Sequence, residues 1–168
     1  MKRIIFFFSL LFIISCQQEM KLIKNKDFVI KVPINAINFK GQMLDNALLE
    51  YSDTSLSIQI IVEKEMTNEF TPIDSARKNF VDYYLKEDAI DSSFIIKKLD
   101  RKNAYIIKTQ TITLNPDFSS DQTFWLVGFY QKTPMEFYIV WVWTPRIYKS
   151  ENEKIMEKIV KSFKIIQQ

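Results

Sequence analysis

The segment FYIVWVW, residues 137–143, constrains the fold more than any other part of the chain, because it is apolar or aromatic at every position. Successive side chains of a β-strand point to opposite faces of the sheet, so a strand here presents apolar groups on both sides. Water on either face would forfeit the free energy gained by burying that face. The sequence therefore predicts a sheet strand that is covered from both sides.

Other segments have the alternation or the turn residues of β-strands. Residues 26–33 alternate around Phe28, Ile30 and Val32. Residues 47–65 predict two strands around a polar turn at 52–54, and a further turn is expected near Gly41. Two longer segments predict hairpins, one over residues 93–115 that turns at 100–103 and one over residues 122–145 that turns at 132–134.

Two segments change to the period of an α-helix. The first covers residues 71–87, with Thr71 as the expected N-cap and Pro72 at the first helical position. The second covers residues 150–166, where Ser150 and Glu153 form a predicted capping box. Each has an apolar stripe at helical spacing, Ile73, Ala76, Phe80, Tyr83 and Tyr84 in the first, and Ile155, Met156, Ile159, Val160, Phe163 and Ile166 in the second. Both helices are expected to lie on the sheet.

The beginning of the chain has the pattern of a secretory signal peptide. Lys2 and Arg3 precede an apolar run over residues 4–15. A bilayer-spanning helix needs roughly 20 such residues, so this run is short for a permanent membrane span. It ends in Ile13-Ile14-Ser15-Cys16, which resembles the lipobox of bacterial lipoproteins, in which the cysteine receives lipid after cleavage.

Cys16 is the only cysteine of the chain, so it has no partner for an intramolecular disulfide. The alternatives are an uncut signal anchor or a secreted protein with a chance cysteine. We expect a signal peptide over residues 1–15, a lipid anchor on Cys16, a tether over residues 16–25 and one domain over residues 26–168. Gln17 stands where aspartate marks inner-membrane retention in enterobacterial lipoproteins. By that resemblance, the expected location is the outer membrane, with the side of the envelope left open.

Composition argues against several classes of function. Removing Lys2 and Arg3 with the signal peptide lowers the formal charge from +3 to +1, which gives no footprint for nucleic acid. The chain has no histidine, which excludes histidine-based nucleophilic systems and the usual zinc sets. Its two glycines form no phosphate-binding loop. No catalytic, cofactor or metal site is therefore predicted, although carboxylate chemistry stays open through acids such as Glu63, Glu65, Asp74 and Asp82.

The order of the elements, strands, one helix, two long hairpins and a terminal helix, carries a family resemblance. Together with the segments FVIKVP, DRKNAYIIK and IMEKIVKSFK, it resembles the PsbP-like/Mog1p-like superfamily, which includes small bacterial lipoproteins. Asn103 replaces the glycine often seen in the hairpin turn, and asparagine also tolerates the left-handed conformation. The resemblance implies an α+β fold, an antiparallel β-sheet flanked by helices on both faces, and no shared catalytic residues.

Two functions remain open from the sequence. The first is a non-catalytic accessory domain that binds a protein of the cell envelope, as the resemblance implies for most members, with Tyr51, Tyr83 and Tyr148 as docking candidates near element ends. The second is a carrier of a hydrophobic small molecule or lipid, suggested by four aromatic residues, Phe124, Trp125, Trp141 and Trp143. An internal apolar cavity would favour the carrier, and close-packed rings would favour the accessory domain.

Overall fold

The structure is a computed structural model that describes residues 18–39, 47–85, 94–99, 103–114 and 120–166. The strands are β1 (Met20–Lys24), β2 (Phe28–Pro33), β3 (Ile37–Asn38), β4 (Leu49–Asp53), β5 (Ile58–Met66), β6 (Ile95–Lys98), β7 (Ala104–Leu114), β8 (Ser120–Thr133), β9 (Glu136–Pro145) and β10 (Lys164–Ile165). The helices are α1 (Ile73–Phe80), the π-helical turn η1 (Val81–Leu85), the 3₁₀ turn η2 (Arg146–Tyr148) and α2 (Lys149–Ser162).

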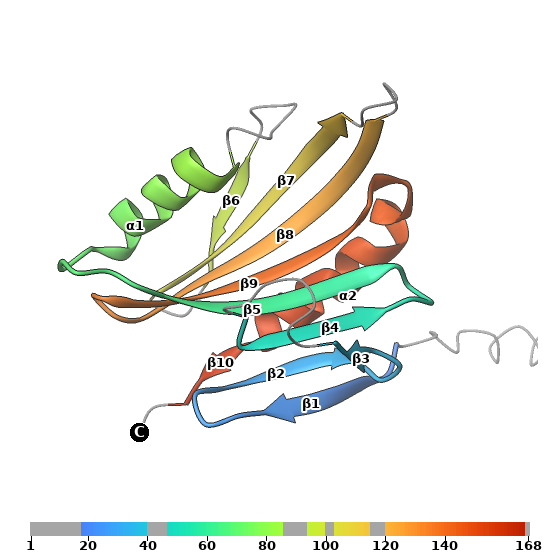
Figure 1. Ribbon diagram of the computed structural model, residues 1–168, viewed down its shortest axis with the longest axis horizontal. Coiled ribbons are helices and arrows are strands. Elements are labelled where there is room, and N and C mark those ends of the chain that lie inside the picture. Colours follow the sequence, from blue (N-terminus) through green and yellow to red (C-terminus); the bar gives the residue numbers. More distant parts are fainter. Residues whose placement is uncertain (1–17, 40–46, 86–93, 100–102, 115–119, 167–168) are drawn as a thin grey trace, which may run out of the picture.

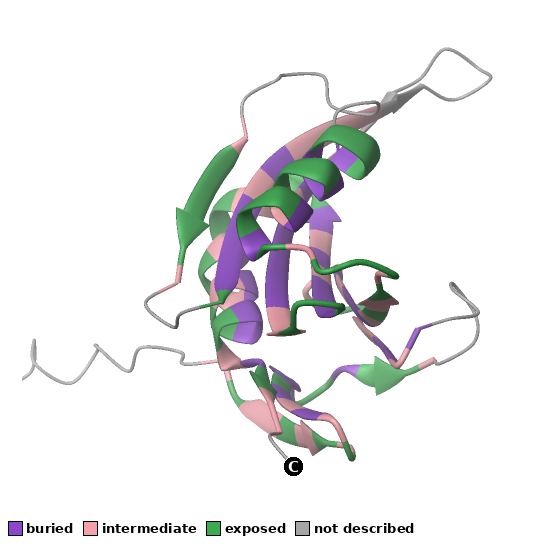
Figure 2. Cartoon of the chain, turned by 90° about the vertical axis from the view of Figure 1, so that its left-hand side faces the viewer, coloured by how far each residue is buried: buried purple, intermediate pink, exposed green. Residues whose placement is uncertain are grey.

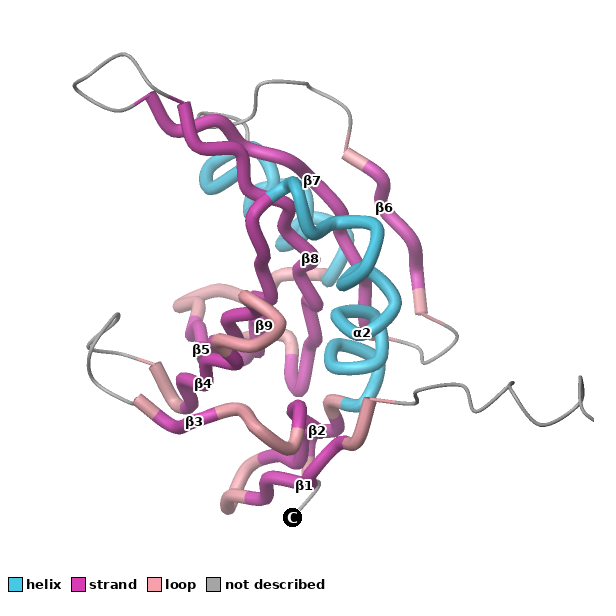
Figure 3. The backbone as a smooth tube through the Cα atoms, turned by 90° about the vertical axis from the view of Figure 1, so that its right-hand side faces the viewer, coloured by secondary structure: helices cyan, strands magenta, loops and turns pink. Residues whose placement is uncertain are grey.

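A seven-stranded antiparallel sheet forms the middle layer of the molecule, in the order β3-β4-β5-β9-β8-β7-β6 (Figure 1). Helix α1 lies against one face of this sheet, and α2 lies against the other (Figure 3). A small antiparallel sheet, β1-β2-β10, packs beside α2 and completes that second cover. The predicted fold, an antiparallel sheet with helices on both faces, is confirmed.

Strand β9 is covered as its sequence requires over most of its length. Tyr138, Val140 and Val142 are buried on the face toward α2, which we call the α2 face. Phe137 and Ile139 are buried on the opposite face, toward α1, which we call the α1 face. Figure 2 shows that the central strands of the large sheet are mostly buried. The last two residues on the α1 face, Trp141 and Trp143, are only partly buried.

The first helix differs from its prediction at both ends. Its N-cap is Pro72 rather than Thr71, and no side chain of a described residue caps the helix. The hydroxyl of Thr71 instead donates a hydrogen bond to the carbonyl of Glu69, 3.1 Å away, within the loop before the helix. After Phe80 the chain continues as the π-helical turn η1, and the expected residues 86 and 87 lie outside the described part of the chain.

The second helix also begins and ends away from its predicted bounds. The predicted capping box is wrong, because α2 begins at Lys149 and places Ser150 inside the helix, while Glu153 pairs with Lys108 on β7 at 2.6 Å. The helix ends at Ser162, whose hydroxyl accepts a hydrogen bond from the amide of Lys31 on β2, at 2.8 Å. Phe163 has extended backbone, and the residues that follow form β10 on β2.

Both predicted hairpins form, but the second turns at residues 134–135 rather than at 132–134, and the predicted turn of the first lies, apart from Asn103, outside the described residues. The first is β6–β7, and the second is β8–β9 with a bulge between Gln131 and Thr133. The turn between β4 and β5 comes slightly later than predicted, at residues 54–57. The expected turn at Gly41 lies outside the described residues.

The beginning of the described chain is more ordered than the expected tether. Residues 20–24 form β1, which pairs along its whole length with β2. Residues 16–19 are therefore the part of the expected tether that precedes the first strand. Cys16 and the expected signal peptide lie outside the described residues. Within the described ranges, none of the helices is long and apolar enough to cross a membrane.

Candidate functional site

The α1 face of the sheet is built from rows of side chains that strand pairing places side by side. One row joins Glu63, Ile139 and Phe129 on β5, β9 and β8. The next row toward the end of β9 joins Ile61, Trp141 and Val127, and the row after that joins Gln59, Trp143 and Trp125. Phe80 of α1 reaches Phe129 and Trp141, with ring centroids 5.4 and 5.3 Å apart. The row of Gln59, Trp143 and Trp125 lies beyond the ring contacts of Phe80, and its side chains are partly exposed.

The three tryptophans form a continuous cluster on this face. The rings of Trp125 and Trp143 stack with centroids 4.9 Å apart and planes tilted by 30°. Trp125 meets Trp141 edge to face at 5.9 Å. The indole N–H of Trp125 donates to the hydroxyl of Thr111 at 2.8 Å, and that of Trp141 donates to a carboxylate oxygen of Glu63 at 2.6 Å. These bonds hold two of the rings and therefore fix the surface on which Trp143 rests.

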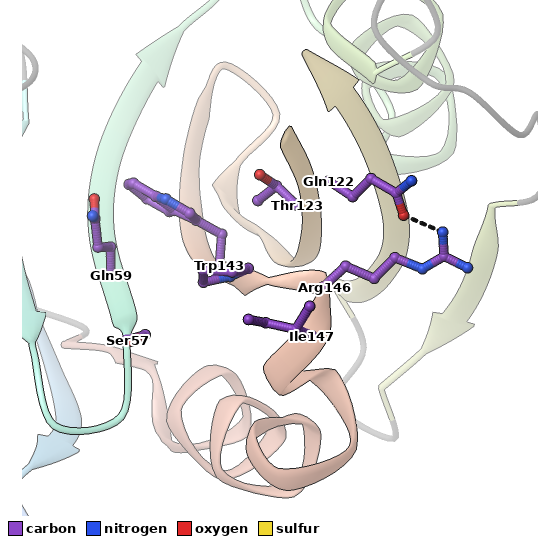
Figure 4. Close-up of a pocket in the computed structure, with 8 residues that line it drawn as sticks. Ser57, Gln59, Gln122, Thr123, Trp143, Arg146 and Ile147 are labelled. Carbon is purple, nitrogen blue, oxygen red and sulfur yellow. Dashed lines mark hydrogen bonds between the residues drawn. The ribbon is translucent and has the colours of Figure 1, made fainter. Parts of the chain in front are cut away.

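A pocket with a volume of about 850 Å³ adjoins this cluster where β5 and β8 begin and β9 ends (Figure 4). The pocket is open to solvent rather than enclosed, and its size lies within the usual range of ligand sites. Its lining comes from four elements or the turns beside them, Ser57 and Gln59 at β5, Gln122 and Thr123 on β8, Trp143 and Pro145 on β9, and Arg146 and Ile147 on η2. This pocket is the candidate functional site.

The polar groups of the pocket point to hydrogen bonding with a ligand. Arg146 donates through Nη1 to the amide oxygen of Gln122. The side-chain oxygen Oε1 of Gln59 is buried and accepts no hydrogen bond from the described residues. Figure 4 shows Trp143 directed toward β5, beside Gln59, whereas Arg146 extends toward Gln122 on β8. The described residues of the lining include no carboxylate, thiol or imidazole, so none of them is a general base of these types or a nucleophilic cysteine.

The acids that the sequence left open for catalysis lie elsewhere and are already engaged. Glu63 accepts the hydrogen bond of Trp141, and Asp74 accepts one from the hydroxyl of Tyr105. Burial and then the nearby Glu63 raise the pKa of Glu65, against a hydrogen bond from Tyr84 that lowers it. Among the described residues, no three side chains of the metal-ligating types come together. The structure therefore does not assemble these acids into one open site.

A second surface feature is an apolar patch at the opposite end of the sheet, which we call the Phe70 patch. It consists of Met66, Phe70 and Met135, which are 64%, 74% and 43% exposed. Two backbone hydrogen bonds hold its loops together, from the amide of Thr67 to the carbonyl of Met135 at 2.9 Å and from the amide of Thr71 to the carbonyl of Pro134 at 3.0 Å. The patch is thus built on paired backbone.

The three tyrosines considered as docking residues lie on different elements. Tyr51 is on β4, partly buried, with Lys21 Nζ 5.6 Å from the centre of its ring. Tyr83 is exposed on η1, where its ring contacts Tyr84 at 4.9 Å. Tyr148 is exposed at the end of η2. The structure does not bring them together as one surface.

Sequence reasoning found the tryptophans but not the residues that complete the pocket. The available signal was the length of the predicted helix. A helix rises about 1.5 Å per residue and a strand about 3.3 Å, so a helix over residues 71–87 spans about 25 Å, against about 33 Å for β9. The predicted helix is therefore too short to follow β9 along its whole length. Arg146, Gln59 and Gln122 gave no signal, because their meeting depends on strand register.

Solved structures with the same fold were found by comparison. The Saccharomyces cerevisiae Ran-binding protein Mog1p is 10% identical, with a TM-score of 0.59 over 89% of this chain and 97% of Mog1p. The cyanobacterial PsbP (CyanoP) of Synechocystis sp. PCC 6803 is 9% identical, with a TM-score of 0.59 over 89% of this chain and 94% of CyanoP. No family model and no curated protein sequence matches the chain. At these identities the likeness concerns the fold alone, and we conclude that this chain has the α+β fold shared by Mog1p and PsbP.

Proposed function

We propose that the protein is a non-catalytic accessory domain that lipid on Cys16 tethers to the bacterial cell envelope, where it binds a protein partner. The observation that carries protein binding is the Phe70 patch. Large apolar side chains that gather on an exposed surface are typical of interaction sites, and aromatic residues and methionine are enriched in the cores of protein interfaces. Mog1p, which has the same fold, is described as a Ran-binding protein.

The position of the patch fits a tethered binding domain. Strand β1 begins at the right-hand end of the molecule in Figure 1, whereas β5 ends and the β8–β9 hairpin turns at the left-hand end. An extended chain spans at most about 3.6 Å per residue, so residues 16–19 would keep the start of β1 within about 15 Å of the lipid. The Phe70 patch at the opposite end would then face away from the membrane and toward a partner.

The partner expected for this patch is a protein with an apolar groove. Phe70 is the most exposed of the three side chains and offers an aromatic anchor, with Met66 and Met135 as further apolar contacts, a combination that suits a groove lined by aliphatic side chains. Glu69, exposed beside Phe70, favours a basic residue on the rim of that groove. The partner is expected in the outer membrane or the space beside it.

The carrier alternative has less support. Phe124 is buried, with Lys149 Nζ 4.8 Å from the centre of its ring, and the three tryptophans pack on one another. The pocket beside them is open and lined by several polar side chains, which suits an apolar lipid poorly. Co-purified lipid detected by native mass spectrometry would favour the carrier instead.

Lipidation is tested with labelled palmitate. Cells that express the parent chain should incorporate the label into the protein, and cells that express Cys16→Ala should not. The Cys16→Ala protein should keep the thermal unfolding of the parent domain, because residue 16 precedes the first strand. Equal labelling of both proteins would refute the anchor.

Protein binding is tested by site-specific photo-cross-linking in intact cells. A photoreactive residue in place of Phe70 should give a discrete cross-linked band, which Met66→Ser and Met135→Ser should weaken together. The matched control is Ile37, which is 67% exposed on β3 and lies outside the patch. The same band from position 37, or no discrete band from position 70, would contradict the proposal. A band at twice the mass of the chain would assign the patch to self-association.

A further inference from the structure

The pocket beside Trp143 lies apart from the Phe70 patch, so a ligand bound there would be distinct from the protein partner. Its lining combines one flat aromatic surface with amide, hydroxyl and guanidinium groups. We propose that this pocket binds an oligosaccharide, with one pyranose ring resting against Trp143. This assignment does not depend on the protein-binding function.

The apolar part of the pocket is preorganised before a ligand binds. Trp143 is supported from one side by the stacked ring of Trp125, and the bond from Trp125 to Thr111 keeps that support in place. Ile147, 78% exposed, and Pro145 extend the apolar surface beside the indole. A rigid aromatic surface lowers the ordering cost of binding, because little side-chain freedom remains to be lost.

The polar part of the pocket restricts the chemistry of the ligand. Gln59 lines the pocket, and its buried Oε1 has no donor among the described residues. A buried acceptor without a partner is costly, so turning this amide toward the pocket to accept an O–H or N–H group of a ligand is favourable. Arg146, on the other side of the pocket, donates to Gln122 through Nη1 and keeps further N–H groups that an acceptor of the ligand can meet (Figure 4). A hydroxyl group donates and accepts, so a ring that carries several hydroxyl groups satisfies both sides at once.

A pyranose ring fits this combination better than the other classes. Its C–H face packs on an indole, and its hydroxyl groups reach outward to amide and guanidinium groups. A lipid chain would leave Gln59 without a partner. A nucleic acid would need more cations than the one guanidinium found among the described lining residues. Because the pocket is open, it also has room for a sugar that is part of a longer glycan.

The test is a tryptophan-fluorescence titration of the full chain in mild detergent with chitotetraose and with cellotetraose. One stacked ring and a few hydrogen bonds correspond to a Kd on the order of 1 mM. We expect a saturable change in emission with at least one of the two sugars. Saturation with both would show that the ring itself is recognised, and saturation with chitotetraose alone would show that the acetamido group is recognised.

Two variants and a control localise the binding. Trp143→Ala should raise the Kd by about tenfold or more, because it removes the stacking surface. Gln59→Leu should raise it by about threefold to tenfold, the loss expected for one hydrogen bond, while the unfolding midpoint stays equal or rises because an unsatisfied buried acceptor is gone. Ile37→Ser should leave the Kd unchanged.

Three results would overturn the proposal. The first is the absence of any emission change with either sugar at about tenfold above the expected Kd. The second is an unchanged Kd in both Trp143→Ala and Gln59→Leu, which would place binding elsewhere. The third is a loss of binding in Gln59→Leu that only follows a loss of stability, since the proposal requires binding to fall while stability does not.

Discussion

Gly128 on β8 lies where α2 packs closely against the sheet. A Cβ atom at this position would lie 2.6 Å from Val160 Cγ1 on α2 and 2.6 Å from Cε2 of Tyr130. Carbon atoms attract one another at about 3.5–4.0 Å, so both contacts are strongly repulsive. We therefore predict that Gly128→Ala destabilises the domain by forcing α2 away from the sheet.

The magnitude follows from how firmly the two neighbours are held. The hydroxyl of Tyr130 donates to the carbonyl of Val160, and its ring lies 4.7 Å from that of Phe163, so the ring cannot simply turn aside. Overpacking of a core costs about 1–3 kcal/mol. Replacing a strand glycine with alanine returns about 0.5–1 kcal/mol of backbone entropy. The net loss should be about 1–2 kcal/mol, which lowers the Tm of a domain of this size by about 3–8 °C.

Thermal unfolding followed by circular dichroism measures this loss, and a double-mutant cycle tests its cause. Val160→Ala removes the atom that the new methyl group would meet, so the double variant should be more stable than the sum of the two single losses predicts, by at least about 0.5 kcal/mol. A Tm for Gly128→Ala equal to or above that of the parent would refute the reasoning. Strict additivity in the cycle would show that the clash with Val160 is not its cause.

Two further variants test the packing of α2 on the sheet. Phe163→Asp should lower the free energy of unfolding by at least about 3 kcal/mol, because the buried ring lies 5.1 Å from that of Phe28 and a carboxylate there would be desolvated. Urea unfolding measures this loss, and a Tm within about two degrees of the parent would contradict it. Hydrogen bonds from Lys108 and Lys161 lower the pKa of Glu157 to about 2, below its ordinary 4.5. The ionised Glu157 side chain therefore stabilises the fold fully above about pH 4.5, and this stabilisation is lost as the pH falls toward 2. Glu157→Gln should therefore cost about 1 kcal/mol at pH 7, after allowance for solvent screening, and almost nothing at pH 2; an equal loss at both pH values would show that charge is not the cause.

Local patterns in the sequence were sufficient for the long elements, but not for the short strands β1, β3 and β10 or for the ends of the helices. The alternation in β8 and β9 and the stripe of α2 predict a hairpin and a helix, since both depend on neighbours in the chain. The predicted caps at Thr71 and Ser150 were wrong, because Thr71 bonds within its own loop and Ser150 lies inside a helix that begins at Lys149. The end of α2 is decided by the contact of Ser162 with β2, a residue distant in sequence.

The sequence by itself determined that β9 must lie inside a sheet covered from both sides, because no polar face was available to it. It did not determine where the cover on the α1 face ends. That depends on the register that places Gln59, Trp143 and Trp125 in one row, and on Phe80 reaching Trp141 in the row before it. Strand register and helix docking join residues far apart in the chain, so only the tertiary structure decides which apolar side chains become core and which form the open pocket.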